Sequence, residues 1–521
     1  MPSLSRRTGR IITLAVAFVA VLAFLYYVIF PSWIKNQIHG LKSDSNTPFN
    51  ISVEKIHATA WPIGLLLKNV SIQQLSSERT VTDSLLVKNI TIQHFNPISY
   101  LFQNKYNVGH ITLDQLDGQW ALLADDSLKV EIAIPFPFSC KTLTLKNIAL
   151  VLKQEGTSQE TNLNGGNFIL KNVLLEKDSL LKTITYEVSE INLTSMYHVS
   201  SDSFYTFRAH QMLYSNKDST LLVDSFFSNP NLEKYAFARQ YPYQTDRVHA
   251  AFKNMTFKQF DLNAWIFAGD LRTSSIHTDS FLLDIFRDRR RPFLHKKRPL
   301  YQDLLYTFPG VLAVDSIIAN NGKIIYTEHD INASEPGIIW FSDVSAQLKN
   351  LYNDTTFSQS QDSFIVTAQA LAMGKGKIQF ESKGKLGDPQ NTFVFNGSME
   401  NIPVAAFNPI LIPNATIKVL DGYVNGIYFN FSADNSLARG DLIFRYKGLS
   451  MEKVDEKTRS SRGLKNRLLT RILKRKIIED NPLPNDTLRT GTIHFERDPE
   501  KMFFWYMLKS IFSGIKETVM K

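Results

Sequence analysis

The sequence predicts a mainly β protein, in which an N-terminal transmembrane helix is followed by an elongated, twisted antiparallel β-groove and by C-terminal amphipathic helices. Three observations support this fold class. Residues 11–30 form a run of 20 residues without a charge. Short runs rich in Val, Ile, Thr, Tyr and Phe then follow one another from about residue 50 to about residue 446, separated by Asn, Asp, Ser and Gly. From residue 464 onward, the apolar residues recur at helical spacing.

The apolar run at residues 11–30 is long enough to cross a membrane, because a helix rises ~1.5 Å per residue and a bilayer core is about 30 Å thick. Three arginines precede the run, so we expect a cytoplasmic N-terminus with the rest of the chain across the membrane. A cleaved signal peptide is the alternative, but the run ends in large residues rather than in a small-x-small cleavage site. The predicted anchor contacts lipid through Ile11, Leu14, Phe18, Leu22, Leu25 and Phe30.

Composition limits the function classes. Cys140 is the only cysteine, so the chain has no intramolecular disulfide and must rely on packing and backbone pairing. The net charge of +9 is concentrated in residues 1–10, 287–299 and 451–521, and the remainder is slightly acidic. A nucleic-acid-binding protein needs a continuous basic face. Nucleic acid is therefore not an expected partner.

The β region contains turn signals and a degenerate repeat. Asp117-Gly118, Asn320-Asn321-Gly322 and Asp421-Gly422 each separate two strand-like runs and predict hairpin turns. Lys-Asn followed by an aliphatic residue occurs at 68–70, 88–90, 146–148 and 171–173, and we expect each phrase to mark the start of a strand. We expect the same of a second phrase, Asp-Ser followed by an apolar residue, at Asp83, Asp126, Asp178, Asp202, Asp224, Asp279, Asp315 and Asp362. Such self-similar units predict an elongated sheet.

Six segments follow from these patterns. They are a cytoplasmic tail (1–10), the transmembrane helix (11–30), a first β-groove segment (31–285), a basic linker (286–309), a second β-groove segment (310–448) and basic and aromatic helices (449–521). The linker is expected to be solvated because charge and proline interrupt the β pattern there. Contact with phospholipid headgroups is the alternative for its basic residues.

The last segment contains two amphipathic patterns, joined by a predicted strand at 490–496. In residues 464–478 an apolar stripe lies opposite basic residues. This helix is expected to cap the groove, to lie on an anionic membrane surface or to dock a partner. The residues expected at anionic headgroups are Arg467, Arg471, Lys474 and Arg475. The final helix is aromatic and is expected to contact a membrane or partner, or to plug the groove, through Phe503, Phe504, Trp505, Leu508, Ile511, Phe512 and Ile515.

Several phrases together resemble the AsmA-like family, the AsmA, TamB and YhdP group of repeating β-groove proteins, in the form found in Bacteroidota. They include the N-terminal anchor, residues 51–70, 314–328 and 337–351, the late phrase from Asn408-Pro409 to Gly426, and Gly514–Thr518. The resemblance implies a curled sheet with an apolar lining, anchored in the inner membrane and projecting into the periplasm. It implies a conduit that carries phospholipid acyl chains towards the outer membrane.

The resemblance brings no catalytic signature. The sequence itself contains no nucleotide-binding loop and no paired histidine ligands, so we expect no catalytic residues, no metal and no cofactor. The expected partners are lipid acyl chains, the inner membrane and outer-membrane or other envelope proteins. A periplasmic scaffold that assists outer-membrane protein assembly is the main alternative function. A membrane-anchored glycan-processing enzyme is a third hypothesis, although no residue pattern supports it.

Overall fold

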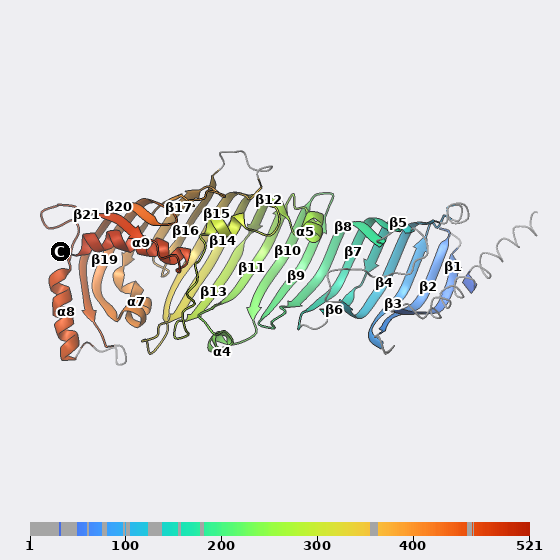
Figure 1. Ribbon diagram of the computed structural model, residues 1–521, viewed down its shortest axis with the longest axis horizontal. Coiled ribbons are helices and arrows are strands. Elements are labelled where there is room, and N and C mark those ends of the chain that lie inside the picture. The colour runs from blue at the N-terminus through green and yellow to red at the C-terminus, as the bar shows by residue number, and fades with distance from the viewer. Residues whose placement is uncertain are drawn as a thin grey trace, which may run out of the picture. The chain divides into compact units, whose positions relative to one another are not determined.

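A computed structural model describes residues 31–32, 49–59, 62–75, 81–96, 99, 105–122, 138–154, 158–177, 182–354, 363–455, 461 and 463–520. The chain divides into two compact units. Unit 1 holds the described residues up to Ser203 together with Phe207–Lys217, and unit 2 holds Phe204–Thr206 and the residues from Asp218 onward. The predicted mainly β class is confirmed for both units (Figure 1).

Unit 1 is a sheet of long strands. Its strands are β1 (Phe49–Thr59), β2 (Gly64–Leu75), β3 (Val81–Gln93), β4 (Tyr106–Leu122), β5 (Phe138–Lys146), β6 (Ala149–Gln154), β7 (Glu160–Lys177), β8 (Lys182–Val199) and most of β9 (Tyr205–Ser215). Sequential pairs from β1 to β4 are antiparallel, as are β7 and β8. Both β5 and β6 pair with β4 on one side and with β7 on the other, so together they act as one strand interrupted near Asn147.

Unit 2 is a sheet with helices. Its strands are β10 (Thr220–Pro230), β11 (Asp246–Lys258), β12 (Leu271–Thr278), β13 (Ser280–Asp288), β14 (Leu312–His329), β15 (Gly337–Tyr352), β16 (Phe364–Ala372), β17 (Gly376–Gly384), β18 (Phe393–Pro403), β19 (Ile417–Ala433), β20 (Leu437–Lys453) and β21 (Thr490–Glu496). Its helices are α4 (Lys234–Arg239), α5 (Leu262–Ala268), α6 (Tyr301–Tyr306), η2 (Val404–Phe407), α7 (Asn408–Ala415), α8 (Leu464–Lys476) and α9 (Phe503–Val519). The strand predicted at 490–496 is confirmed as β21.

The predicted linker at 286–309 belongs to unit 2 and does not separate two sheets. Residues 286–288 complete β13, and the chain then continues through α6 to β14. Because β12 and β13 run parallel to β14, a hairpin cannot join them, and the chain must cross the sheet before β14 begins. The charge and proline in this segment therefore mark a crossover connection.

The three predicted hairpin turns are also wrong. Gly118 lies inside β4, Asn320-Asn321-Gly322 inside β14, and Asp421-Gly422 inside β19. Gly118, Asn321 and Gly422 have positive φ, which a hairpin turn and a β-bulge both require. The register shifts around Gly322 and Asp421 identify these two sites as bulges.

Three of the four Lys-Asn phrases lie inside strands, and only the phrase at 146–148 directly precedes one, β6. Asn69 and Asn172 lie in the middle of β2 and β7, and Asn147 lies between β5 and β6, all with positive φ. Asn89 lies within β3 without this conformation. Three of the four phrases therefore mark a break within or between strands, because asparagine tolerates left-handed backbone geometry better than most residues.

The predicted transmembrane helix at 11–30 lies outside the described residues. Among the helices that the structure does describe, none is both long and apolar enough to cross a bilayer.

Candidate functional site

One face of the β1–β4 sheet in unit 1 is lined with aliphatic side chains. Five of them are buried: Leu65, Leu67, Val70, Val87 and Leu116. Around these pack half-buried apolar residues, namely Ile51, Val53, Ile56, Ala58, Ile72, Leu85, Ile90, Ile92, Leu113 and Leu150. We call this set the aliphatic lining. The half-buried side chains of the lining retain apolar surface that is accessible to solvent.

In a regular strand, side chains point alternately to the two faces of the sheet. Near the middle of each of these strands the alternation shifts by one residue, and the lining residues on both sides of the shift therefore lie on one face. In β2, the lining residues are Leu65 and Leu67 on one side of Lys68-Asn69, and Val70 and Ile72 on the other. A regular strand would place Val70 on the face opposite Leu67. Asn69 has a positive φ, and the register against β1 and β3 is unchanged across it, so the alternation reverses there and Val70 returns to the face of Leu67.

The positions at which neighbouring strands reverse their alternation lie side by side and form a crease across the sheet. Asn69 lies opposite Lys88, and Lys88 lies opposite Gln115, as the flanking registers show. The next strand bends at Asn147, whose side chain donates a 2.8 Å hydrogen bond to Asp114 beside Gln115. Because these positions match across paired strands, they form one continuous line across the sheet.

Unit 2 contains a similar crease, in which residues with positive φ lie in adjacent strands. Asn254 in β11 donates a 3.0 Å hydrogen bond to Asp279, the residue at which β12 gives way to β13. Asn321 in β14 donates a hydrogen bond to the backbone carbonyl of Asp279. The next bulge, in β15, lies at Asp343. Both units are therefore creased by polar residues with left-handed backbones.

The face of β1–β4 opposite the lining is mainly polar. Ser52 pairs with Ser71 and Thr91 with Thr112 in register, and exposed lysines project at the crease. Leu66, which pairs with Thr91, and Leu86, which is 50% exposed, are exceptions on this face. Within the part of unit 1 that the structure describes, no helix or second sheet covers the aliphatic lining. A layer of this kind normally buries its apolar face against another element. The aliphatic lining is the candidate site.

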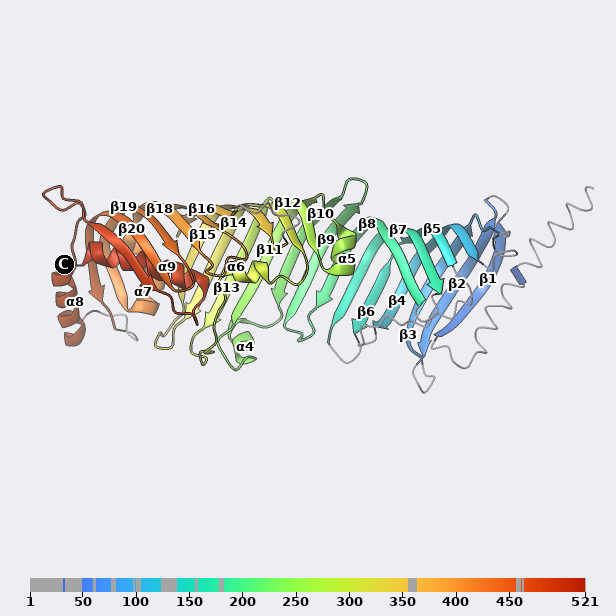
Figure 2. The same cartoon turned by 45° about the horizontal axis from the view of Figure 1, so that its top comes forward.

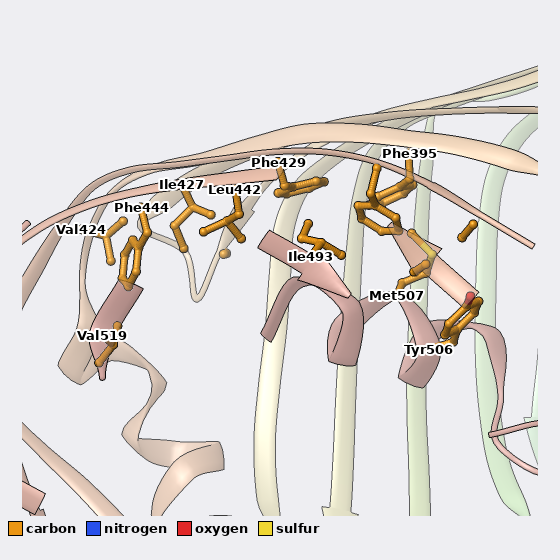
Figure 3. Close-up of a cluster of buried hydrophobic side chains, with 14 of the residues drawn as sticks. Phe395, Val424, Ile427, Phe429, Leu442, Phe444, Ile493, Tyr506, Met507 and Val519 are labelled. Carbon is orange, nitrogen blue, oxygen red and sulfur yellow. The ribbon is translucent and has the colours of Figure 1, made fainter. Parts of the chain in front are cut away.

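Unit 2 differs, because α9 covers the apolar face of β18–β21. Figure 3 shows Phe429, Leu442 and Ile493 projecting from the sheet towards the helix that carries Tyr506 and Met507. All five side chains are buried, and Leu442, Ile493 and Tyr506 are fully so. The final helix is therefore part of the core of unit 2 (Figures 1 and 2).

Small residues form the seam between α9 and the sheet. Ser510, Gly514 and Thr518 recur every four residues and are buried. The helix also covers the free edge of β21, since the backbone N–H of Thr492 donates to the Glu517 carboxylate at 2.7 Å and that of His494 to the Ser513 hydroxyl at 3.2 Å. Unpaired edge groups invite another strand to pair, and α9 occupies them here.

The predicted contact residues of α9 divide into two groups. Phe503, Ile511 and Ile515 pack against the core, and the ring of Trp505 contacts Phe495. Phe504, Leu508 and Phe512 point away from it, with exposed fractions of 80%, 52% and 45%. These three residues, four apart, form an apolar row on the outer side of α9. Hydrophobic spacing alone did not separate the two groups.

The basic helix is confirmed as α8, and it is anchored only in part. Ile477, directly after the helix, is buried, and the backbone N–H of Lys453 donates to the Thr470 hydroxyl at 2.9 Å. Leu468 and Ile472 are 60% and 43% exposed, beside exposed arginines. Those arginines are Arg467, Arg471 and Arg475; the side chain of Lys474 lies outside the described set. The exposed side of α8 thus combines cations with apolar side chains.

A network of ion pairs lies at one end of β13 and β14. Arg287 binds both oxygens of Asp246 at 2.6 and 2.5 Å, and Arg289 lies 3.1 Å from Glu328 and from Asp330. Burial lowers the pKa of Arg287, but the Asp246 carboxylate outweighs it and holds that pKa above its ordinary value. These ion pairs connect the ends of β11, β13 and β14.

Sequence reasoning missed the crease and the seam of α9. Two consecutive polar residues between alternating apolar pairs, as at Lys68-Asn69, were the available signal for the crease. Glycine in a helix and glycine in the neighbouring strand, Gly514 and Gly491, were the signal for the seam.

No protein-family model matches the chain, and no curated protein matches it.

Proposed function

We propose that the protein is an AsmA-like, non-enzymatic lipid-transfer protein that is anchored in the inner membrane and moves phospholipids through the periplasm towards the outer membrane. In this proposal residues 11–30 hold the chain in the membrane. The aliphatic lining of unit 1 carries acyl chains. The exposed sides of α8 and α9 contact the acceptor membrane or an acceptor protein.

The aliphatic lining is the observation that supports the proposal. Removing one methylene from water is favourable by ~0.8 kcal/mol, so a complete acyl chain would gain on the order of 10 kcal/mol on the lining. Contact with aliphatic side chains does not depend on position along the chain, so a lipid can move from strand to strand without a large barrier. The polar opposite face keeps the sheet in water.

Two features support membrane contact at the C-terminal end of the chain. The row Phe504, Leu508 and Phe512 offers apolar side chains, and the arginines of α8 offer cations beside Leu468 and Ile472. Helices of this composition bind anionic membrane surfaces.

The test is lipid that copurifies with the full chain from membranes in mild detergent, measured by mass spectrometry of the intact complex. We expect bound phospholipid that survives gel filtration. The alternative function, a periplasmic scaffold for outer-membrane proteins, predicts capture of an envelope protein without bound lipid. The absence of lipid from the intact complex would contradict the proposal.

A further inference from the structure

The crossover between β13 and β14 passes over the apolar side of the unit 2 sheet. The chain leaves β13 at Asp288, which pairs with His329 at one end of β14, and returns at Leu312, at the other end. On the way, Leu300 is fully buried in the cluster that contains Tyr506. The ring of Tyr301 lies 4.5 Å from that of Phe503. Residues 289–300, which we call the strap, therefore lie on the side of the sheet that α9 covers.

A pocket of about 310 Å³ lies between the strap and the end of the sheet. Its walls are the loop 241–246, Arg287 at the end of β13, Leu294 and Arg298 of the strap, and Met502 before α9. Tyr243 and Met502 are each 42% exposed, so the pocket opens at the surface. This volume lies at the lower end of the range for small-molecule sites.

Arg298 is fixed in position, yet its charge is not paired. Its backbone N–H donates to the Pro499 carbonyl at 2.7 Å, and its own carbonyl accepts a 2.5 Å hydrogen bond from Arg497. Across the described ranges of the chain, no hydrogen-bond acceptor or carboxylate pairs with the Arg298 guanidinium. Arg298 thus lines the pocket with a restrained peptide and with a guanidinium whose five N–H donors have no partner among the described residues.

The pocket carries one excess positive charge. Asp246 is the one acidic residue among the side chains that line it, and Arg287 already binds both of its oxygens. Arg291, on the strap beside the pocket, donates to the Tyr241 carbonyl and holds the loop 241–246 in place. An anion that enters would meet Arg298 without displacing an existing ion pair.

We propose that this pocket binds a phosphate ester, with Arg298 as its principal contact, and that the ester is the headgroup of a phospholipid whose acyl chains lie against apolar surface. A guanidinium presents two parallel N–H groups that match two phosphate oxygens. Pro242, Leu294 and Met502 supply apolar walls for the adjoining glycerol. The assignment of the ester to a lipid rests on the proposed function, whereas the anion site does not.

The experiment compares full-length wild type with Arg298→Gln and Lys297→Gln. Lys297 is the matched control, because it is the neighbouring residue, carries the same charge and is exposed outside the pocket. The probes are dioleoylphosphatidylglycerol, dioleoylglycerol and sn-glycerol 3-phosphate. Retention of the two lipids is measured by mass spectrometry of the intact complex, and binding of glycerol 3-phosphate by calorimetry. A thermal unfolding curve for each variant confirms that it is folded.

We expect Arg298→Gln to lower phosphatidylglycerol retention about tenfold and to leave dioleoylglycerol retention unchanged, while Lys297→Gln changes neither. Equal losses in both variants, or none in Arg298→Gln, would overturn the proposal and leave lipid transfer intact. If wild type retains no lipid, the proposed function fails. The anion site would then be supported by saturable binding of glycerol 3-phosphate that Arg298→Gln abolishes, and refuted by its absence.

Discussion

Gly491 in β21 and Gly514 in α9 lie in backbone contact. A Cβ atom added at Gly491 would lie 2.1 Å from the carbonyl oxygen of Gly514. This approach lets α9 sit close enough for Glu517 and Ser513 to accept hydrogen bonds from the edge of β21. The last helix of the chain is thereby fixed to the last strand of the sheet.

Gly491→Ala is expected to destabilise unit 2 by roughly 1–3 kcal/mol, because backbone atoms on both sides must separate to admit the methyl group. Gly463→Ala is the control, since a Cβ there would meet only the end of Asn466, at 3.9 Å. Urea unfolding followed by fluorescence measures both variants. Equal stability of the two would show that α9 does not depend on this contact.

Deleting residues 500–521 should impair the folding of unit 2 as well as delivery. The deletion removes Tyr506, Met507 and Val519 from the core and uncovers the edge of β21.

Replacing only the outer row of α9, as Phe504→Ser, Leu508→Ser and Phe512→Ser together, should leave the unfolding midpoint nearly unchanged and lower binding to anionic vesicles. Unchanged vesicle binding in the triple variant would remove this row from the membrane contact.

The difference in backbone conformation predicts opposite effects of glycine at two similar Lys-Asn phrases. Asn172 has φ +52 and an exposed side chain, so Asn172→Gly should be neutral or slightly stabilising, and Asn172→Val should cost roughly 1–2 kcal/mol. Asn89 lacks this backbone conformation, so Asn89→Gly should cost about 0.5–1 kcal/mol. The free energy of unfolding in urea distinguishes them. A loss at Asn172→Gly that matched the loss at Asn89→Gly would contradict the role assigned to the bulge.

The stability of unit 2 should fall in acid through Asp288. Burial raises the pKa of Asp288, but hydrogen bonds from the Arg290 side chain and backbone outweigh it and hold the pKa below its ordinary value. A lowered carboxyl pKa stabilises the folded state at pH values above about 4. This stabilisation is lost as the pH falls through the pKa of the folded state.

Asp288→Asn should therefore be less stable than wild type at pH 7, and the difference should narrow at pH 3. Asn at this position keeps the size of the side chain and removes the charge. Urea midpoints at the two pH values provide the measurement. A difference independent of pH would assign the effect to packing instead.

The sequence predicted the β class, the position of β21 and the two C-terminal helices, because these depend on local periodicity. It mispredicted Asn321 and Gly422 as turns, since positive φ serves both a turn and a bulge and only the neighbouring strand decides between them. It also did not predict the inner face of α9. Ser510 and Thr518 look like solvent-facing residues, and they are buried only because Gly491 admits the helix so closely.

The aliphatic lining is tested most directly by a charge placed on each face of one strand. Ile90 belongs to the lining, and Thr91 projects from the opposite face, where it pairs with Thr112. Copurified phospholipid, measured by mass spectrometry for Ile90→Asp and Thr91→Asp at equal folded fraction, is the decisive quantity. The account predicts a loss of most bound lipid in Ile90→Asp and wild-type lipid in Thr91→Asp. Equal lipid in the two variants would contradict it.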